Sequence, residues 1–237
     1  MVQTIINRGR KLLQTEHKSI LSAALVIAGS YLASALLGLV RNHLLAARFF
    51  GGMEADLDVY FAALVLPDTI FQLLVVGAVS AAFIPVFQDH LVKGKDTARR
   101  LSDAALTIVG LILFVLTLLL IIFARPIAGL MAHYSPDKLD LMANLIRIMS
   151  LAQLLFTFSA FFTGILQAQR RFLIPAIAPL LYNLGTILGI VFLSSKIGIY
   201  SAGVGVVFGA LLHVLIQLPL VRHLGYSPRF LFQPGHP

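Results

Sequence analysis

Six long stretches of almost uninterrupted apolar residues alternate with short polar segments along this chain. A helix needs about 20 mostly apolar residues to cross a bilayer, and each stretch reaches that length. The pattern predicts spanning helices at about 19–47, 57–87, 101–124, 139–167, 174–193 and 200–220. Membrane strands would instead be about ten residues long with alternating polarity. We therefore expect an all-α, polytopic integral membrane protein built as a six-transmembrane-helix bundle.

Polar segments flank the predicted bundle and divide the chain into three parts. Residues 1–18 form a basic N-terminal segment that we expect in the cytoplasm. Residues 19–224 form the six-helix transmembrane lobe. Residues 225–237 are polar and proline-rich, and we interpret them as a truncated linker.

Composition agrees with a membrane protein, because 59% of the 237 residues are hydrophobic and only 12% are charged. Soluble domains carry about 25% charged residues. The absence of cysteine excludes disulfides and thiolate metal sites, and the seven histidines are scattered. We expect no metal and no cofactor. The sequence has no glycine-rich phosphate loop and no nucleophile elbow, so we expect a protein that is not an enzyme.

The formal net charge of +8 comes from basic residues that lie mainly between the apolar runs. This distribution is typical of membrane topology, and we expect no nucleic acid as a partner. Twelve lysines and arginines fall on one side of the predicted bundle and six on the other or inside helices near it. The positive-inside rule then places both termini in the cytoplasm. The predicted external segments are Gly51–Asp56, Arg125–Asp137 and Ser194–Ile199, and Gln88–Arg100 is predicted as a cytoplasmic loop.

Small and basic residues share one face of the first predicted helix. The residues on this face are Ser30, Ser34, Gly38, Arg41 and Arg48. Successive side chains of a helix are 100° apart around its axis, and these five lie within about 80° of one another. Small residues let another helix approach closely. A charge deep in the bilayer costs about 2.5–3.5 kcal/mol on insertion scales, so each arginine either faces a wet cavity or extends to the outer surface.

The second predicted helix carries Asp58, Asp68, Thr69 and Gln72 on one side if it is ideal. Pro67 predicts a bend, because proline lacks the backbone N–H and crowds the preceding turn. Asp68 is about ten residues into the helix. It is either a cavity-facing or proton-sensitive carboxylate, or a structural acid that is paired or protonated.

Polar and small residues also mark the later helices. Arg147 begins a polar seam with Ser150, Gln153 and Thr157, which is either contact between helices or a binding site. The sixth helix has small and polar residues four apart, and the fifth repeats the close-packing pattern. These positions are Ser201, Gly205, Gly209, His213 and Gln217, with Gly185 and Gly189 on the fifth helix.

Five stretches, in order, resemble the MurJ/MviN family of lipid II flippases within the MOP exporter superfamily. They are 34–41 with 47–51, then 58–67, 77–85, 164–183 and 217–219. The longest looks like the family pattern L-N-x-x-x-R-F-x-x-P-A-x-x-P-x-x-x-N, which ends here at Asn183. The family fold has two six-helix lobes plus two further helices, and this chain resembles the first lobe.

The resemblance implies a transporter in the cytoplasmic (inner) membrane. Its substrate would be a lipid-linked saccharide pyrophosphate such as lipid II, a peptidoglycan precursor, moved by alternating access. Its partners would be the lipid bilayer and either the C-terminal lobe of the same protein or a second copy. Family arginines in the cavity are thought to hold the pyrophosphate. Arg41 and Arg48 match them, whereas Ala35, Phe71 and Gln72 stand where the family has arginine.

The candidate substrate-binding residues combine these observations. They are Arg41, Arg48, Ser34, Asp58, Asp68, Gln72, Arg147 and Asn183. Two other functions remain open at this point. One is a different MOP-superfamily exporter that moves polysaccharide-lipids or drugs, and the other is a non-transporting structural membrane subunit.

Overall fold

The computed structural model describes residues 20–77 and 79–226, and every regular element in that part of the chain is a helix. Six of the helices are long and apolar enough to cross a membrane, which confirms the predicted six-helix membrane bundle. The helices, with two π-helical segments written η, have the following bounds. They are α2 (Ile20–Phe49), α3 (Glu54–Phe71), η1 (Gln72–Val76), η2 (Val79–Phe83), α4 (Ile84–Lys93), α5 (Lys95–Ile122), α6 (Ala124–Met131), α7 (Pro136–Ala168), α8 (Leu173–Ile197) and α9 (Tyr200–His223). The predicted basic segment 1–18 and residues 227–237 of the predicted linker lie outside the described residues.

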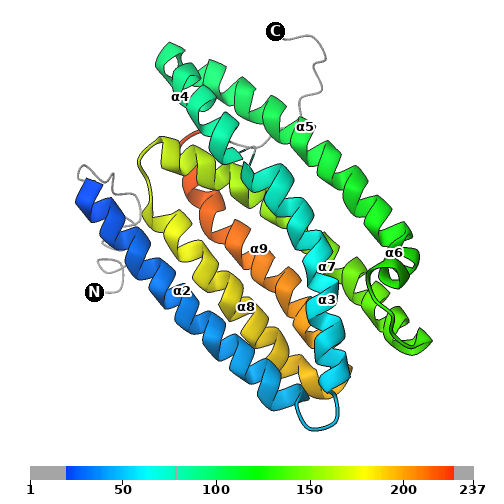
Figure 1. The fold of residues 1–237 in the computed structure, drawn as a ribbon. Coiled ribbons are helices and arrows are strands. Elements are labelled where there is room, and N and C mark those ends of the chain that lie inside the picture. The colour runs from blue at the N-terminus through cyan, green and yellow to red at the C-terminus, as the bar shows by residue number, and fades with distance from the viewer. Residues whose placement is uncertain (1–19, 78, 227–237) are drawn as a thin grey trace.

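The bundle is layered, with α2 and α5 on opposite sides (Figure 1). Between them, α8 packs on α2, α9 packs on α8, α7 packs on α9, and α5 packs on α7; α3 also packs on α7. Apolar side chains on the outward face of α5, such as Leu111, Phe114 and Leu118, are about half exposed. In a bilayer these exposed apolar side chains face hydrocarbon, so the helix needs no further protein cover.

The second spanning segment is longer than predicted and does not end where a cytoplasmic loop was expected. The helix continues through Pro67 as α3, and the change in geometry comes later, at the π-helical turns η1 and η2. Beyond them α4 runs to Lys93, and Gly94 alone connects it to α5. Gly94 has φ of 143°, a conformation that glycine adopts without steric cost. The prediction of a loop at Gln88–Arg100 is therefore wrong. This segment is part of a helical hairpin with a one-residue turn.

The predicted external segment Arg125–Asp137 is also partly helical, which corrects its assignment as a loop. Its first part forms α6, whose Ala124 and Ala128 are fully buried in a core shared with α7. Arg125 also forms an ion pair with Asp140 of α7. The small alanines let the short helix approach α7 closely, so tertiary packing stabilises a segment too short to be a stable helix by itself.

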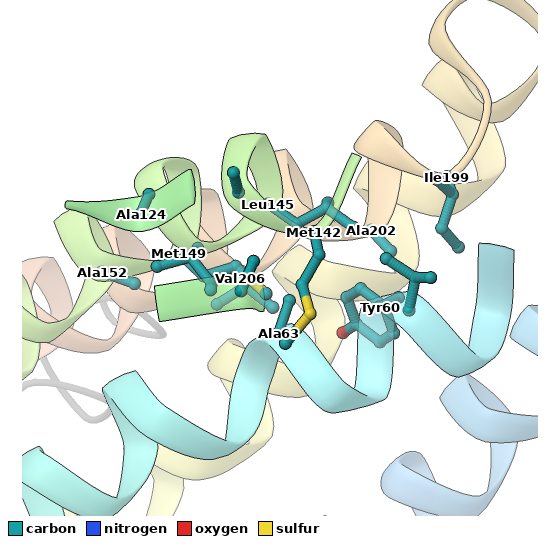
Figure 2. Close-up of a cluster of buried hydrophobic side chains, with 14 of the residues drawn as sticks. Tyr60, Ala63, Ala124, Met142, Leu145, Met149, Ala152, Ile199, Ala202 and Val206 are labelled. Atoms are coloured by element: carbon teal, nitrogen blue, oxygen red, sulfur yellow. The ribbon is translucent and has the colours of Figure 1, made fainter. Parts of the chain in front are cut away.

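Two clusters of buried apolar side chains hold the bundle together. Figure 2 shows one of them, where Tyr60 and Ala63 of α3 lie against Met142 of α7, with Ala202 and Val206 of α9 nearby. The second cluster includes residues of α4, α7 and α9, among them Phe87, Phe161 and Val221. Both clusters contain several residues of α7, so this helix packs in both cores of the lobe.

The glycines predicted to allow close packing on the fifth and sixth spanning helices face each other in the structure. A Cβ atom placed on Gly185 would lie 2.4 Å from Gly209 Cα, and one on Gly189 would lie 2.5 Å from Gly205 Cα. No real Cβ contact is that short, so the glycines of α8 and α9 allow a backbone separation that any side chain would prevent.

Candidate functional site

A partly open cavity of about 480 Å³ is lined by residues of α2, α3, η1, η2, α4, α7, α8 and α9. Much of its lining is apolar, with Phe71 and Phe156 among the contributing side chains. The side chains with polar groups in its lining are Tyr31, Asp68, Gln72, Thr163, Gln167, Tyr182 and His213. Polar groups that converge in a cavity at membrane depth mark a candidate binding site.

Beside this cavity, Arg41 of α2 is held by Asn183 of α8. Arg41 Nη1 donates to Asn183 Oδ1 at 3.2 Å. The Asn183 amide nitrogen in turn donates to the carbonyl oxygen of Ser34 at 3.0 Å and to its Oγ at 3.1 Å. Gly38 lies between these residues on the helix, and a Cβ placed there would be 4.0 Å from Asn183 Nδ2. The structure thus brings together three of the predicted site residues.

The remaining contacts of Arg41 connect it to the cavity wall and to the surface. Its Nε and Nη2 donate to the side-chain oxygen of the exposed Asn42 at 3.2 and 3.1 Å. Its guanidinium also interacts with Tyr182, which lines the cavity. The half-buried guanidinium therefore neighbours a residue of the cavity wall without being part of the lining itself.

Asp68 and Gln72 both line the cavity, and the Gln72 side chain interacts with the Asp68 carboxyl group. They are four residues apart, so the helix places them on one face. Thr69, which the helical projection grouped with them, donates instead to the carbonyl oxygen of Val65 at 2.7 Å and is absent from the lining.

Three predicted site residues lie away from the cavity. Arg48 is exposed near the end of α2, and Asp58 is exposed near the start of α3. Arg147 donates from Nε to the Ile121 carbonyl oxygen at 3.1 Å and from Nη1 to Asn144 Oδ1 at 2.7 Å. The last four carbonyl groups of a helix lack intrahelical partners, and Ile121 is the penultimate residue of α5. Arg147 therefore caps α5, and a role in binding substrate stays a prediction for all three residues.

The structure contains a polar network between α7 and α9 that the sequence analysis did not predict. Gln217 Nε2 donates to Ser159 Oγ at 2.5 Å, and Ser159 Oγ contacts His213 Nδ1. Thr163 donates to Gln217 Oε1 at 3.0 Å. The stripe on the sixth helix indicated His213 and Gln217. Their partners on α7, Ser159 and Thr163, could have been found only as two hydroxyl residues spaced four apart.

The family model described as "Lipid II flippase MurJ" matches residues 46–236. The chain is 27% identical over 219 residues to a probable lipid II flippase MurJ of Borreliella burgdorferi, covering 92% of this chain and 43% of that protein. It is 31% identical over 225 residues to a probable lipid II flippase MurJ of Bdellovibrio bacteriovorus, covering 92% of this chain and 42% of that protein.

A solved structure is also similar, that of a lipid II flippase MurJ in an inward closed conformation. It superposes with a TM-score of 0.70 at 26% identity, covering 88% of this chain and 43% of that one. The chain thus spans less than half the length of the relatives that it matches.

Proposed function

The chain belongs to the lipid II flippase MurJ family, and on this premise we propose that it forms one wall of a path for a lipid-linked, anionic precursor across the membrane. The proposed substrate is a saccharide pyrophosphate on a lipid carrier, such as lipid II. The proposed activity is transport by alternating access and not catalysis. The proposed location is the cytoplasmic membrane.

The observation that carries this proposal is the position of Arg41 at the edge of the cavity. A guanidinium has five N–H donors and binds phosphate oxygens as a planar fork. Asn183 fixes one end of this fork from α8, while Nε and Nη2 point to the exposed Asn42. Because Asn42 is exposed, phosphate oxygens can replace it as acceptors and its amide can return to water. Arg41 is therefore pre-oriented for a phosphate ligand.

Transport by alternating access requires a second structural unit opposite this lobe. Transporters of this kind move two bodies against each other around one site. The relatives named above are more than twice as long as the matched region, which is consistent with a second lobe in those proteins. We propose that the C-terminal lobe of the same protein or a second copy of this chain supplies the opposite wall.

The decisive experiment is transport of a labelled lipid-linked pyrophosphate in vesicles that contain this lobe with its second lobe. Arg41→Ala should abolish flipping, and Arg41→Lys should restore only a small part, because an ammonium lacks the planar fork. Arg100→Ala is the matched control, since Arg100 is an exposed arginine of α5 outside the cavity. Normal flipping by the Arg41→Ala protein at equal abundance would contradict the proposal.

A further inference from the structure

The acid Asp68 lies in the middle of a spanning segment and exposes its carboxylate to the cavity. Within the described residues it forms no ion pair, and its side-chain partner is the neutral amide of Gln72. Arg41 has its own acceptors on Asn183 and Asn42. A carboxylate at membrane depth is costly unless something neutralises it, so an intramembrane acid without a basic partner indicates a function.

Two pairs of polar side chains from different helices line the cavity on which Asp68 opens. Asp68 and Gln72 are four apart on the α3–η1 segment, and Thr163 and Gln167 are four apart on α7. Helical residues four apart share a face, so each pair presents two oxygen-bearing side chains to the same space. The helices α3 and α7 pack directly against each other.

The oxygen atoms of these side chains remain available to a ligand. Thr163 donates its hydroxyl hydrogen to Gln217 Oε1, which leaves lone pairs on Oγ1. Gln167 has no side-chain hydrogen bond among the described residues. The Asp68 carboxylate forms no ion pair within the described residues, so its oxygens are available to a cation.

The chemistry of this donor set selects the class of ligand. Carboxylate, amide and hydroxyl oxygens are ligands for hard cations. In the described part of the chain, no group of three or more His, Cys, Asp or Glu side chains could hold a metal ion, so softer transition metals have no such site. One carboxylate balances one positive charge, whereas a divalent ion would leave a net charge inside the membrane.

We propose that Asp68, Thr163 and Gln167 form a binding site for a monovalent alkali-metal cation, Na⁺ or K⁺, in the cavity between α3 and α7. Asp68 supplies the neutralising charge. Thr163 and Gln167 supply neutral oxygens from the opposite helix. Cation binding links α3 and α7 across the cavity and should stabilise the lobe whether or not it transports anything.

The test uses the purified 237-residue chain in nanodiscs at constant ionic strength, with choline chloride exchanged for NaCl or KCl. Two readouts are the midpoint of thermal unfolding by circular dichroism and the binding of radioactive ²²Na⁺ or ⁸⁶Rb⁺. One alkali cation should raise the midpoint in a saturable manner. Asp68→Asn should weaken the apparent affinity at least tenfold, and Thr163→Val and Gln167→Leu should weaken it several-fold.

The control is Asp89→Asn, which removes an exposed carboxylate of α4 outside the cavity and should leave the cation response unchanged. Equal responses to Na⁺, K⁺ and choline would overturn the site, as would an unchanged response in the Asp68→Asn chain. A response to Mg²⁺ in place of the alkali cations would overturn the charge argument. A midpoint that depends on pH through Asp68, without radioactive cation binding, would assign the carboxylate to a proton instead.

Discussion

Asn183 of α8 accepts a hydrogen bond from Arg41 of α2 at 3.2 Å, across 142 residues of sequence. The same amide donates to the backbone and side chain of Ser34, about two helical turns from Arg41 on α2. It therefore satisfies two polar groups of a helix that otherwise packs through apolar and small side chains. Asn183 thus adds a polar contact to the apolar packing of α2, whose Leu45 and Phe49 are buried in the core of the lobe.

We expect Asn183→Ala to lower the stability of the lobe by about 0.5–1.5 kcal/mol, because it removes the hydrogen bonds to the half-buried side chains of Arg41 and Ser34. Thermal unfolding followed by circular dichroism measures this, since the chain has no tryptophan for fluorescence. Asn42→Ala is the control, as Asn42 is exposed and water can replace its amide. Equal losses of stability in both variants would contradict a structural role for the bridge.

Gly209→Ala should destabilise the contact between α8 and α9. A Cβ at this position would lie 2.4 Å from the Tyr182 carbonyl oxygen, and backbone atoms cannot move aside cheaply. Overpacking of this kind costs about 1–3 kcal/mol or more. The matched substitution is Gly110→Ala in α5, where nothing lies within 4 Å of the added Cβ and the helix should gain about 0.5–1 kcal/mol. The two variants should thus shift the unfolding midpoint in opposite directions.

Arg147→Ala distinguishes the cap of α5 from a binding residue. Loss of the bond to the Ile121 carbonyl oxygen should reduce stability by about 1–3 kcal/mol and leave the affinity for a lipid-linked pyrophosphate unchanged. Binding is measured by ligand-dependent native mass spectrometry alongside thermal unfolding. A large loss of affinity with unchanged stability would instead support the substrate-binding role predicted from sequence.

The orientation of the bundle can be measured by cysteine labelling, because the chain has no native cysteine. Asp96 is exposed beside the Gly94 turn, and Ser135 is exposed before α7 at the opposite end of that hairpin. With cytoplasmic termini, a membrane-impermeant maleimide added to intact cells should label Ser135→Cys and not Asp96→Cys. The reverse pattern would invert the topology. Gly94 itself is unsuitable, since its φ of 143° would strain a cysteine.

We also expect the 237-residue chain alone to insert and fold but not to flip lipid-linked substrate. One lobe supplies one of the two bodies that alternating access requires. Purified chain in vesicles, with a fluorescent lipid-linked precursor, measures the flipping rate against empty vesicles. Substrate-dependent flipping that Arg41→Ala abolishes would show that this lobe, or a dimer of it, is sufficient.

Much of the fold follows from sequence alone, because the bilayer imposes a simple rule on it. A spanning segment must satisfy its own backbone hydrogen bonds and present apolar side chains to lipid. The number of helices and their approximate bounds can therefore be predicted from the hydropathy of the sequence. The positions that allow close packing could also be predicted, because Gly185 and Gly189 repeat at helical spacing, but their partner helix could not. The resemblance carried by the motif that ends at Asn183 likewise needed no structure.

The partners of each polar residue were decided by the tertiary structure. Helical periodicity places Arg41 and Arg48 on the same broad face, yet Arg41 meets an acceptor on α8 whereas the side chain of Arg48 is exposed. From sequence, Arg147 was grouped with a polar seam on its own helix. In the structure its guanidinium donates to a carbonyl oxygen at the end of α5, a contact that depends on how α5 and α7 cross. Asp68 and Thr163 line one cavity although 95 residues separate them. Periodicity reports the face of a single helix, whereas a site is made where the faces of several helices meet.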